Sequence, residues 1–214
     1  MIEKIQNEIF DEWKEKRNNI IPDGIVNIGK YSESKIKVLY ILKEVNGGKN
    51  WNLRDFLNIN GGRFQTWNNI ARWQYGIENF EEQNLWDKVE HIEEEFRKKQ
   101  LRKIAVVNLK KVPGTETSEM SEIRKYAWND RELLKRQISL YEPNIIVCCG
   151  TGEIVKEYKL VDNEFFKNWT KSNSNLNFHL TKNERLIISH CHPQKRLGNK
   201  EKFSPLIKTV EENY

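Results

Sequence analysis

The chain has little cysteine and no long apolar run. Its 214 residues include three cysteines, whose positions match neither a disulfide framework nor the spacing of a zinc or iron–sulfur site. We therefore expect a reducing compartment and no bound metal. No stretch near the N-terminus has the apolar core of a signal peptide, and none approaches the length of a membrane span. The sequence predicts a cytoplasmic protein with no membrane partner.

The sequence also lacks internal repeats and linkers. Its length suits one domain over residues 1–214, and 37% hydrophobic residues with seven Trp, seven Tyr and nine Phe are enough for one core. We expect this domain to be a monomer.

The net charge of +5 is concentrated in the second half of the chain. Residues 1–100 hold 16 Lys and Arg against 17 Asp and Glu, whereas residues 101–214 hold 20 against 14. Charge placed in this way favours a polyanion partner such as DNA. The alternative is an ordinary solvated surface.

Strand-like and helix-like segments alternate along the chain. Four apolar, β-branched runs predict strands centred near residues 37–42, 104–108, 145–149 and 186–190. Helical patterns lie before and between them, and loops are expected at 43–48 and 110–118. This order predicts an α/β fold, a three-layer αβα domain with a central four-stranded parallel sheet.

Polar residues follow each predicted strand, at the edge where open parallel sheets bind ligands. These residues are Glu44, Asn108, Gly150, Thr151 and His192. The proline after the last of them fixes its own φ and holds the histidine in an extended conformation. His190 and Cys191 precede that histidine, but consecutive strand residues point to opposite faces and no second cluster completes a metal site.

Several segments carry an ordered set of motif residues. Lys43–Gly47 reads Lys-Glu-Val-Asn-Gly, Phe64 follows two glycines, and Val107–Gly114 reads Val-Asn-Leu-Lys-Lys-Val-Pro-Gly. Gln137–Gly150 passes through Pro-Asn-Ile-Ile-Val to a glycine, and His192 precedes proline. In this order they resemble Gly-Glu-Ala-Pro-Gly, a base-stacking Phe, Asn-x-x-Lys-x-x-Pro-Pro, Pro-x-Val-Ile-Val-x-Leu-Gly and His-Pro-Ser of the iron–sulfur branch of the uracil-DNA glycosylase superfamily.

The resemblance spans roughly residues 36–200 and has clear departures. Lys43 and Asn46 replace a glycine and a proline of the first motif, Gln194 replaces the serine after His-Pro, and the cluster cysteines are missing. The resemblance therefore implies a uracil-DNA-glycosylase-like fold without an iron–sulfur cluster. With a more polar first-motif turn, it favours a damaged or enlarged base over plain uracil.

The resemblance implies a role for each residue of the site. Glu44 would orient water or shield the sugar cation, and His192 would donate a hydrogen bond to the departing base. Asn108 has both a donor and an acceptor for a pyrimidine edge, and Phe64 would stack on the extruded base. Asn46 would make the entrance of the base pocket looser and more polar.

Each role has a structural alternative. Glu44 could be a surface carboxylate in a turn, paired with Lys43 or Lys49. Asn108 could cap a helix or a turn. The aromatic residues of the segment 51–80 could be core rather than a platform for bases.

The expected DNA-binding residues are Lys110, Lys111, Gly150, Thr151, Lys195, Arg196 and Leu197. The four cations lie on two loops predicted at the same sheet edge, where they would grip phosphates. The glycine and threonine begin a helix and would add backbone donors. The leucine lies where the superfamily inserts a wedge into the duplex, although a core or turn leucine fits equally.

The sequence therefore predicts a monofunctional DNA glycosylase that needs no cofactor, acting in repair or in phage defence. A lyase would need an activated amine, and nothing in the sequence marks Lys43 as one. One alternative is a nucleic-acid-binding protein that has lost catalysis. Another is a hydrolase of free nucleosides or nucleotides.

Overall fold

A computed structural model describes residues 1–48, 50–114, 118–163 and 166–214. Its elements are α1 (Ile2–Lys16), β1 (Gly24–Ile25), α2 (Ile28–Glu33), β2 (Val38–Asn46), α3 (Leu53–Asn60), α4 (Phe64–Glu78), α5 (Leu85–Val89), α6 (Glu94–Leu101), β3 (Ile104–Gly114), α7 (Met120–Asn129), α8 (Arg131–Leu140), β4 (Ile145–Cys149), α9 (Gly152–Glu157), β5 (Thr170–Lys171), β6 (Asn177–Leu180), β7 (Leu186–His190) and α10 (Asn199–Asn213). The alternation of strands and helices makes this an α/β protein, as the sequence predicts.

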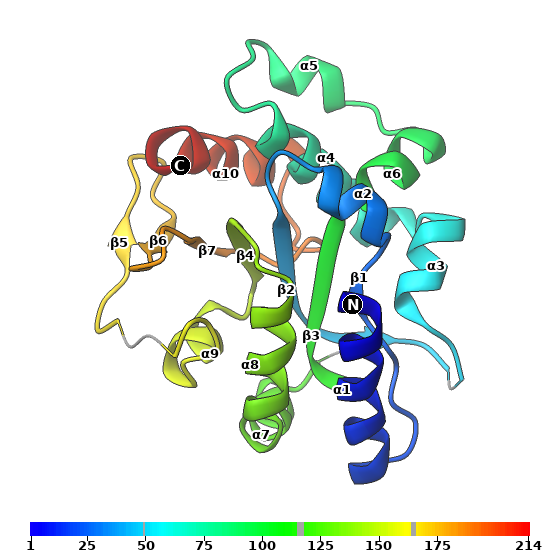
Figure 1. The fold of residues 1–214 in the computed structure, drawn as a ribbon. Helices are drawn as coiled ribbons and strands as arrows, with labels where there is room; N and C mark the ends of the chain where they lie inside the picture. The colour runs from blue at the N-terminus through cyan, green and yellow to red at the C-terminus, as the bar shows by residue number, and fades with distance from the viewer. Residues whose placement is uncertain (49, 115–117, 164–165) are drawn as a thin grey trace.

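One mixed sheet of seven strands runs through the molecule in the order β1-β3-β2-β4-β7-β6-β5 (Figure 1). Its centre, β3-β2-β4-β7, is the expected set of four parallel strands. The expectation that these four make up the whole sheet is wrong, because β1, β6 and β5 extend it by antiparallel pairing. The added strands are two to four residues long, too short for an alternating pattern to reveal them.

Helices pack on both faces of the sheet because the central strands are apolar on both sides. On one face Tyr40 and Leu42 join a cluster with residues of α3, α4, α5, α6 and α10. On the other face Leu39 and Ile41 pack with α1, α7, α8 and α9. Within the described ranges, no helix is long and apolar enough to cross a membrane.

Two strands continue beyond their expected ends. β2 extends to Asn46 and β3 to Gly114, so most of the segments expected to be loops are paired backbone. The register places Leu42 opposite Asn108 and Glu44 opposite Lys110, with an irregularity before Asn46. Residues 115–117 of the second expected loop lie outside the described residues. The consequence is that Glu44 stands on a strand and not on a flexible turn.

Candidate active site

A cavity of about 190 Å³ lies at the carboxyl edge of the parallel strands. Glu44 and Asn46 line it from β2, Asn108 from β3, and His192 from the loop after β7. The structure thus brings together residues from three segments that lie far apart in the sequence. They meet because β2 and β3 are parallel neighbours and β7 ends at the same edge.

Glu44 is held by a buried ion pair. Its Oε2 lies 2.7 Å from Nζ of Lys110, and the two side chains are 4% and 5% exposed. Burial alone would lower the pKa of Lys110, but its hydrogen bonds to Glu44 and Glu122 outweigh burial and raise the pKa above the ordinary value. Lys110 therefore stays protonated and positively charged beside the Glu44 carboxylate. The alternative of a surface carboxylate paired with Lys43 is wrong, and Lys49 lies outside the described residues.

Gly114 closes the other side of the Glu44 carboxylate. A Cβ atom at position 114 would lie 2.1 Å from Cδ and 2.2 Å from Oε2 of Glu44. No other residue type fits there unless the carboxylate moves, so this glycine is required by a close approach and not by its backbone angles.

His192 lines the cavity, and its neutral ring has one N–H. Its Nδ1 accepts a hydrogen bond of 3.2 Å from the backbone N–H of Gln194, which assigns the ring proton of the neutral form to Nε2. Burial, together with the charges of Lys43 and Lys202, lowers the pKa of His192 to about 4. At neutral pH the ring is therefore an uncharged donor.

Two helices fix the loop that carries His192. The carbonyl oxygen of Pro193 accepts hydrogen bonds from Asn69 of α4 at 2.9 Å and from Lys202 of α10 at 3.1 Å. Lys202 is 4% exposed, and burial lowers its pKa. These contacts hold the residue next to His192 in place, and the sequence motif carries no sign of them.

Asn108 is a buried strand residue, so the alternative of a helix or turn cap is wrong. Its side-chain Nδ2 and backbone N–H both donate to Asp23. The expectation that its donor and acceptor are both free for a ligand is therefore only partly met.

The two lysines after Asn108 are not available to phosphates, which corrects an expectation. Lys111 is 0% exposed and pairs with Asp23 at 2.7 Å, and Lys110 is 4% exposed and pairs with Glu44. A buried and neutralised ammonium cannot reach a DNA backbone. Because β3 is unexpectedly long, both lysines lie on a strand within the fold and not on an exposed loop.

Of the two backbone donors expected at Gly150 and Thr151, the N–H of Gly150 is taken. The N–H of Gly150 donates to the carbonyl oxygen of His190 at 2.8 Å. The hydroxyl of Thr151 donates to the carbonyl oxygen of Ile41 at 2.9 Å. The helix that follows, α9, has only six residues. This corner ties β2, β4 and β7 together, and its expected role in phosphate binding is not supported.

The loop after His192 presents the remaining expected DNA-binding residues to solvent. Lys195 and Arg196 are exposed, and Leu197 is 43% exposed. Leu197 is therefore not a core leucine. Of the predicted phosphate-binding cations, only those of this loop are accessible.

Aromatic side chains line the cavity, although not the one that the sequence favours. Phe64 is 60% exposed at the first turn of α4 and is not among the lining residues. Trp51, Phe56 and Trp67 line the cavity instead. The sequence signal that could have found them is the concentration of aromatic residues in the segment 51–80.

Polar side chains at the cavity rim complete the lining. Gln194 donates from Nε2 to the hydroxyl of Thr66 at 2.7 Å and so bridges the His192 loop to α4. Arg63 also lines the cavity and extends into an adjoining hollow of about 470 Å³, which shares Asn46 and two of the aromatic residues with it. The cavity and this wider hollow are therefore neighbours that share part of their lining.

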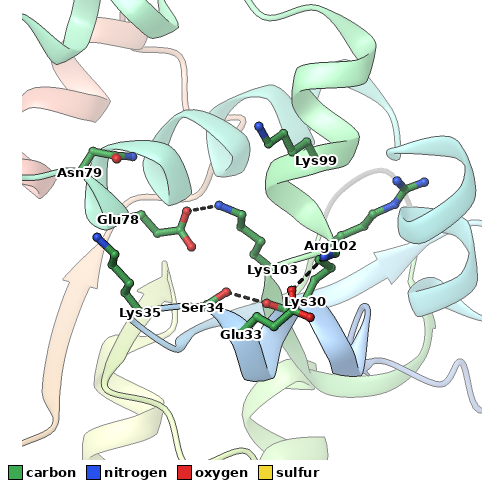
Figure 2. A pocket seen from close by; sticks show the side chains of 9 residues that line it. All are labelled: Lys30, Glu33, Ser34, Lys35, Glu78, Asn79, Lys99, Arg102 and Lys103. Atoms are coloured by element: carbon green, nitrogen blue, oxygen red, sulfur yellow. Dashed lines mark hydrogen bonds and ion pairs between the residues drawn. The ribbon is translucent and has the colours of Figure 1, made fainter.

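A separate pocket of about 410 Å³ is lined by five positively charged Lys and Arg side chains (Figure 2). Residues at the carboxyl ends of α2, α4 and α6 line it, and Figure 2 shows Lys103 directed at Glu78, with their charged atoms 2.5 Å apart. Cations are favourable at helix carboxyl ends because they compensate the helix dipole. The charge of this pocket has a structural explanation, and we assign no chemistry to it.

Nothing among the residues that the structure describes forms a group of three or more His, Cys, Asp or Glu side chains suited to a metal ion. His190 packs edge-on against Trp73, with ring centroids 4.6 Å apart.

Neither a family model nor a curated protein matches this sequence. Function must therefore be argued from the chemistry of the site itself.

Proposed function

We propose that this protein is a DNA glycosylase that hydrolyses the N-glycosidic bond of a flipped base. The observation that carries the proposal is the single cavity lined by Glu44, Asn108 and His192, each from a different strand or strand end. A carboxylate, an amide and a neutral imidazole are the groups that the resemblance to uracil-DNA glycosylases implies for this reaction. The accessible cations Lys195 and Arg196 follow His192 on the same loop, where the phosphates of a bound strand would lie.

The chemistry divides between the two ends of the breaking bond. The bond between C1′ and the base nitrogen breaks, and its electron pair leaves with the base. The Nε2–H of His192 donates a hydrogen bond to the base anion, and the carboxylate of Glu44 stabilises the sugar cation. Water then forms a bond to C1′ and releases its proton to solvent or to Glu44. Lys110 fixes the orientation of that carboxylate.

The volumes of the cavity and of the adjoining hollow together support a substrate larger than a plain base. At about 190 Å³ the cavity is smaller than the pockets of about 300–1,000 Å³ that bind drug-sized ligands, which suits one heterocyclic ring. The adjoining hollow, which shares Asn46 and Trp51 with the cavity, has a volume that would hold a substituent on that ring. We therefore propose an enlarged or polar modified base, rather than plain uracil, as the substrate.

A catalytically inactive nucleic-acid-binding protein is the second candidate, and one observation favours it. The Glu44 side chain is 4% exposed and already paired with Lys110, which limits its contact with water. The two candidates differ in one product, the abasic site.

A screen of oligonucleotides with uracil, hypoxanthine, mismatches and bulky modified cytosines, scored for alkali-labile sites, tests the proposal. For the active substrate, Glu44→Gln and His192→Ala should each slow single-turnover excision by about 10²–10⁴-fold. Both variants should retain wild-type affinity for DNA. DNA binding without any abasic product would support the second candidate.

A further inference from the structure

Asp23 is a buried carboxylate next to the cavity, and donors surround it. Its Oδ2 accepts from the backbone N–H of Asn108 at 2.7 Å and from Nδ2 of the same residue at 3.1 Å. Nζ of Lys111 lies 2.7 and 2.9 Å from its two oxygens, and Nε2 of Gln137 donates to Oδ1 at 2.8 Å. Asp23 is 0% exposed, so these contacts are made away from solvent.

These contacts decide which way the Asn108 amide faces. An ionised carboxylate can only accept hydrogen bonds, so the group of Asn108 that meets Asp23 must be its NH₂. The carbonyl oxygen Oδ1 is then directed elsewhere. Oδ1 is buried and has no hydrogen-bond partner among the described residues, although Asn108 lines the cavity. A buried acceptor without a partner is unfavourable, so a ligand that supplies a donor would be preferred.

We propose that Asp23 is a positioning residue, which holds the Asn108 amide with its carbonyl oxygen free so that the cavity selects a ring edge carrying an N–H donor. The identification of the ligand as a base rests on the proposed function. Imide N–H groups and exocyclic amines are the donors that pyrimidine bases offer. An edge that presents only acceptors or alkylated nitrogen is rejected.

The surrounding network keeps Asp23 in place. Gln137 accepts from Lys111 at 2.7 Å, and its Nε2 also donates to the hydroxyl of Tyr141 at 2.9 Å. That hydroxyl donates to Gln6 of α1 at 2.7 Å. Groups from β3 and α8 therefore hold the carboxylate, and Gln6 of α1 holds the outer end of the network. The orientation of the Asn108 amide is thus built into the fold.

Free uracil and 3-methyluracil, titrated separately and followed by NMR, test the proposal without requiring excision. They differ in the ring N–H, so we expect uracil to bind about 5- to 150-fold more tightly. A purely steric effect of the methyl group would give the same preference. A variant that releases the amide distinguishes the two explanations.

The paired substitution D23L with K111M removes both charges of the buried pair and leaves no unpaired charge. Leucine has the branched shape of aspartate but no acceptor, so the Asn108 amide is no longer fixed, and the preference for uracil should fall at least about fivefold. A merely structural role would weaken both ligands equally. The matched control is R17M with D130L, which removes a second ion pair with a fully buried carboxylate. Among the described residues that pair has no hydrogen bond to Asn108, so the control should keep the wild-type preference.

Equal affinities of the wild-type protein for the two bases, or no binding of either, would overturn the proposal. So would an unchanged preference in the variant with D23L and K111M. A protein that prefers uracil in this assay but cleaves no N-glycosidic bond would refute the proposed function and leave the role of Asp23 standing. If the protein excises a base but shows no preference for uracil over 3-methyluracil, the role of Asp23 is refuted and the proposed function stands.

Discussion

Replacing Gly114 by alanine should displace the carboxylate of Glu44 while leaving the fold intact. The new Cβ would lie 2.1 Å from Cδ of Glu44, whereas ordinary contacts begin at 3.4 Å. The carboxylate must therefore retreat by about 1 Å or more, and a misplacement of that size can slow a reaction about 10²-fold. This corresponds to about 2.7 kcal/mol in the barrier.

The assay for Gly114→Ala is single-turnover release of whichever base the oligonucleotide screen identifies, together with thermal unfolding of the same samples. Gly114 is the last residue of β3, so we expect a small change in Tm. Gly29→Ala is the matched control, because its new Cβ lies 3.6 Å from the nearest atom and no residue of α2 lines the cavity. Full activity of a folded Gly114→Ala protein would show that the position of Glu44 does not matter for catalysis.

Three further outcomes follow from the site. His190 and His192 have pKa values of about 4 in the folded protein, whereas the unfolded chain protonates its histidines near pH 6.5. The free energy of unfolding should therefore fall as the pH drops from about 6.5 to about 4. Titration midpoints of the two rings near pH 6.5, measured by NMR, would contradict this. Replacing Lys195 and Arg196 together by alanine should weaken binding to every DNA sequence and reduce the salt slope by about two units, and a changed base selectivity at equal affinity would contradict a phosphate-binding role. Oligonucleotides with plain uracil should be excised weakly or not at all, and efficient excision of uracil with no gain for an enlarged base would refute the role given to the adjoining hollow.

The central fold was predictable because its signals are local and strong. Apolar runs such as Ile145–Cys149 are buried on both faces, and the runs that predict the four parallel strands carry that pattern. The edge strands were not predictable, since β1 and β5 have two residues each and are held by pairing with other strands. Tertiary pairing decides such segments, not propensity.

The candidate site, like the fold, was predictable only in part. Glu44, Asn108 and His192 follow apolar runs, and parallel strands that end at one edge bring such residues together. The burial of Lys110 and Lys111 was not predictable, because it depends on β3 continuing to Gly114 and on acidic partners as remote as Asp23. Sequence patterns show that a lysine is charged, but not which carboxylate neutralises it.

The most direct test of the account is to detect both products of one reaction. Duplex DNA with a single modified base is incubated with the protein, the free base is measured by mass spectrometry, and the abasic strand is measured by alkaline cleavage. We predict equal amounts of the two products from the wild-type protein, and a rate reduced at least about 10²-fold in Glu44→Gln. Tight DNA binding with neither product, across the whole set of modified bases, would contradict the assignment as a glycosylase.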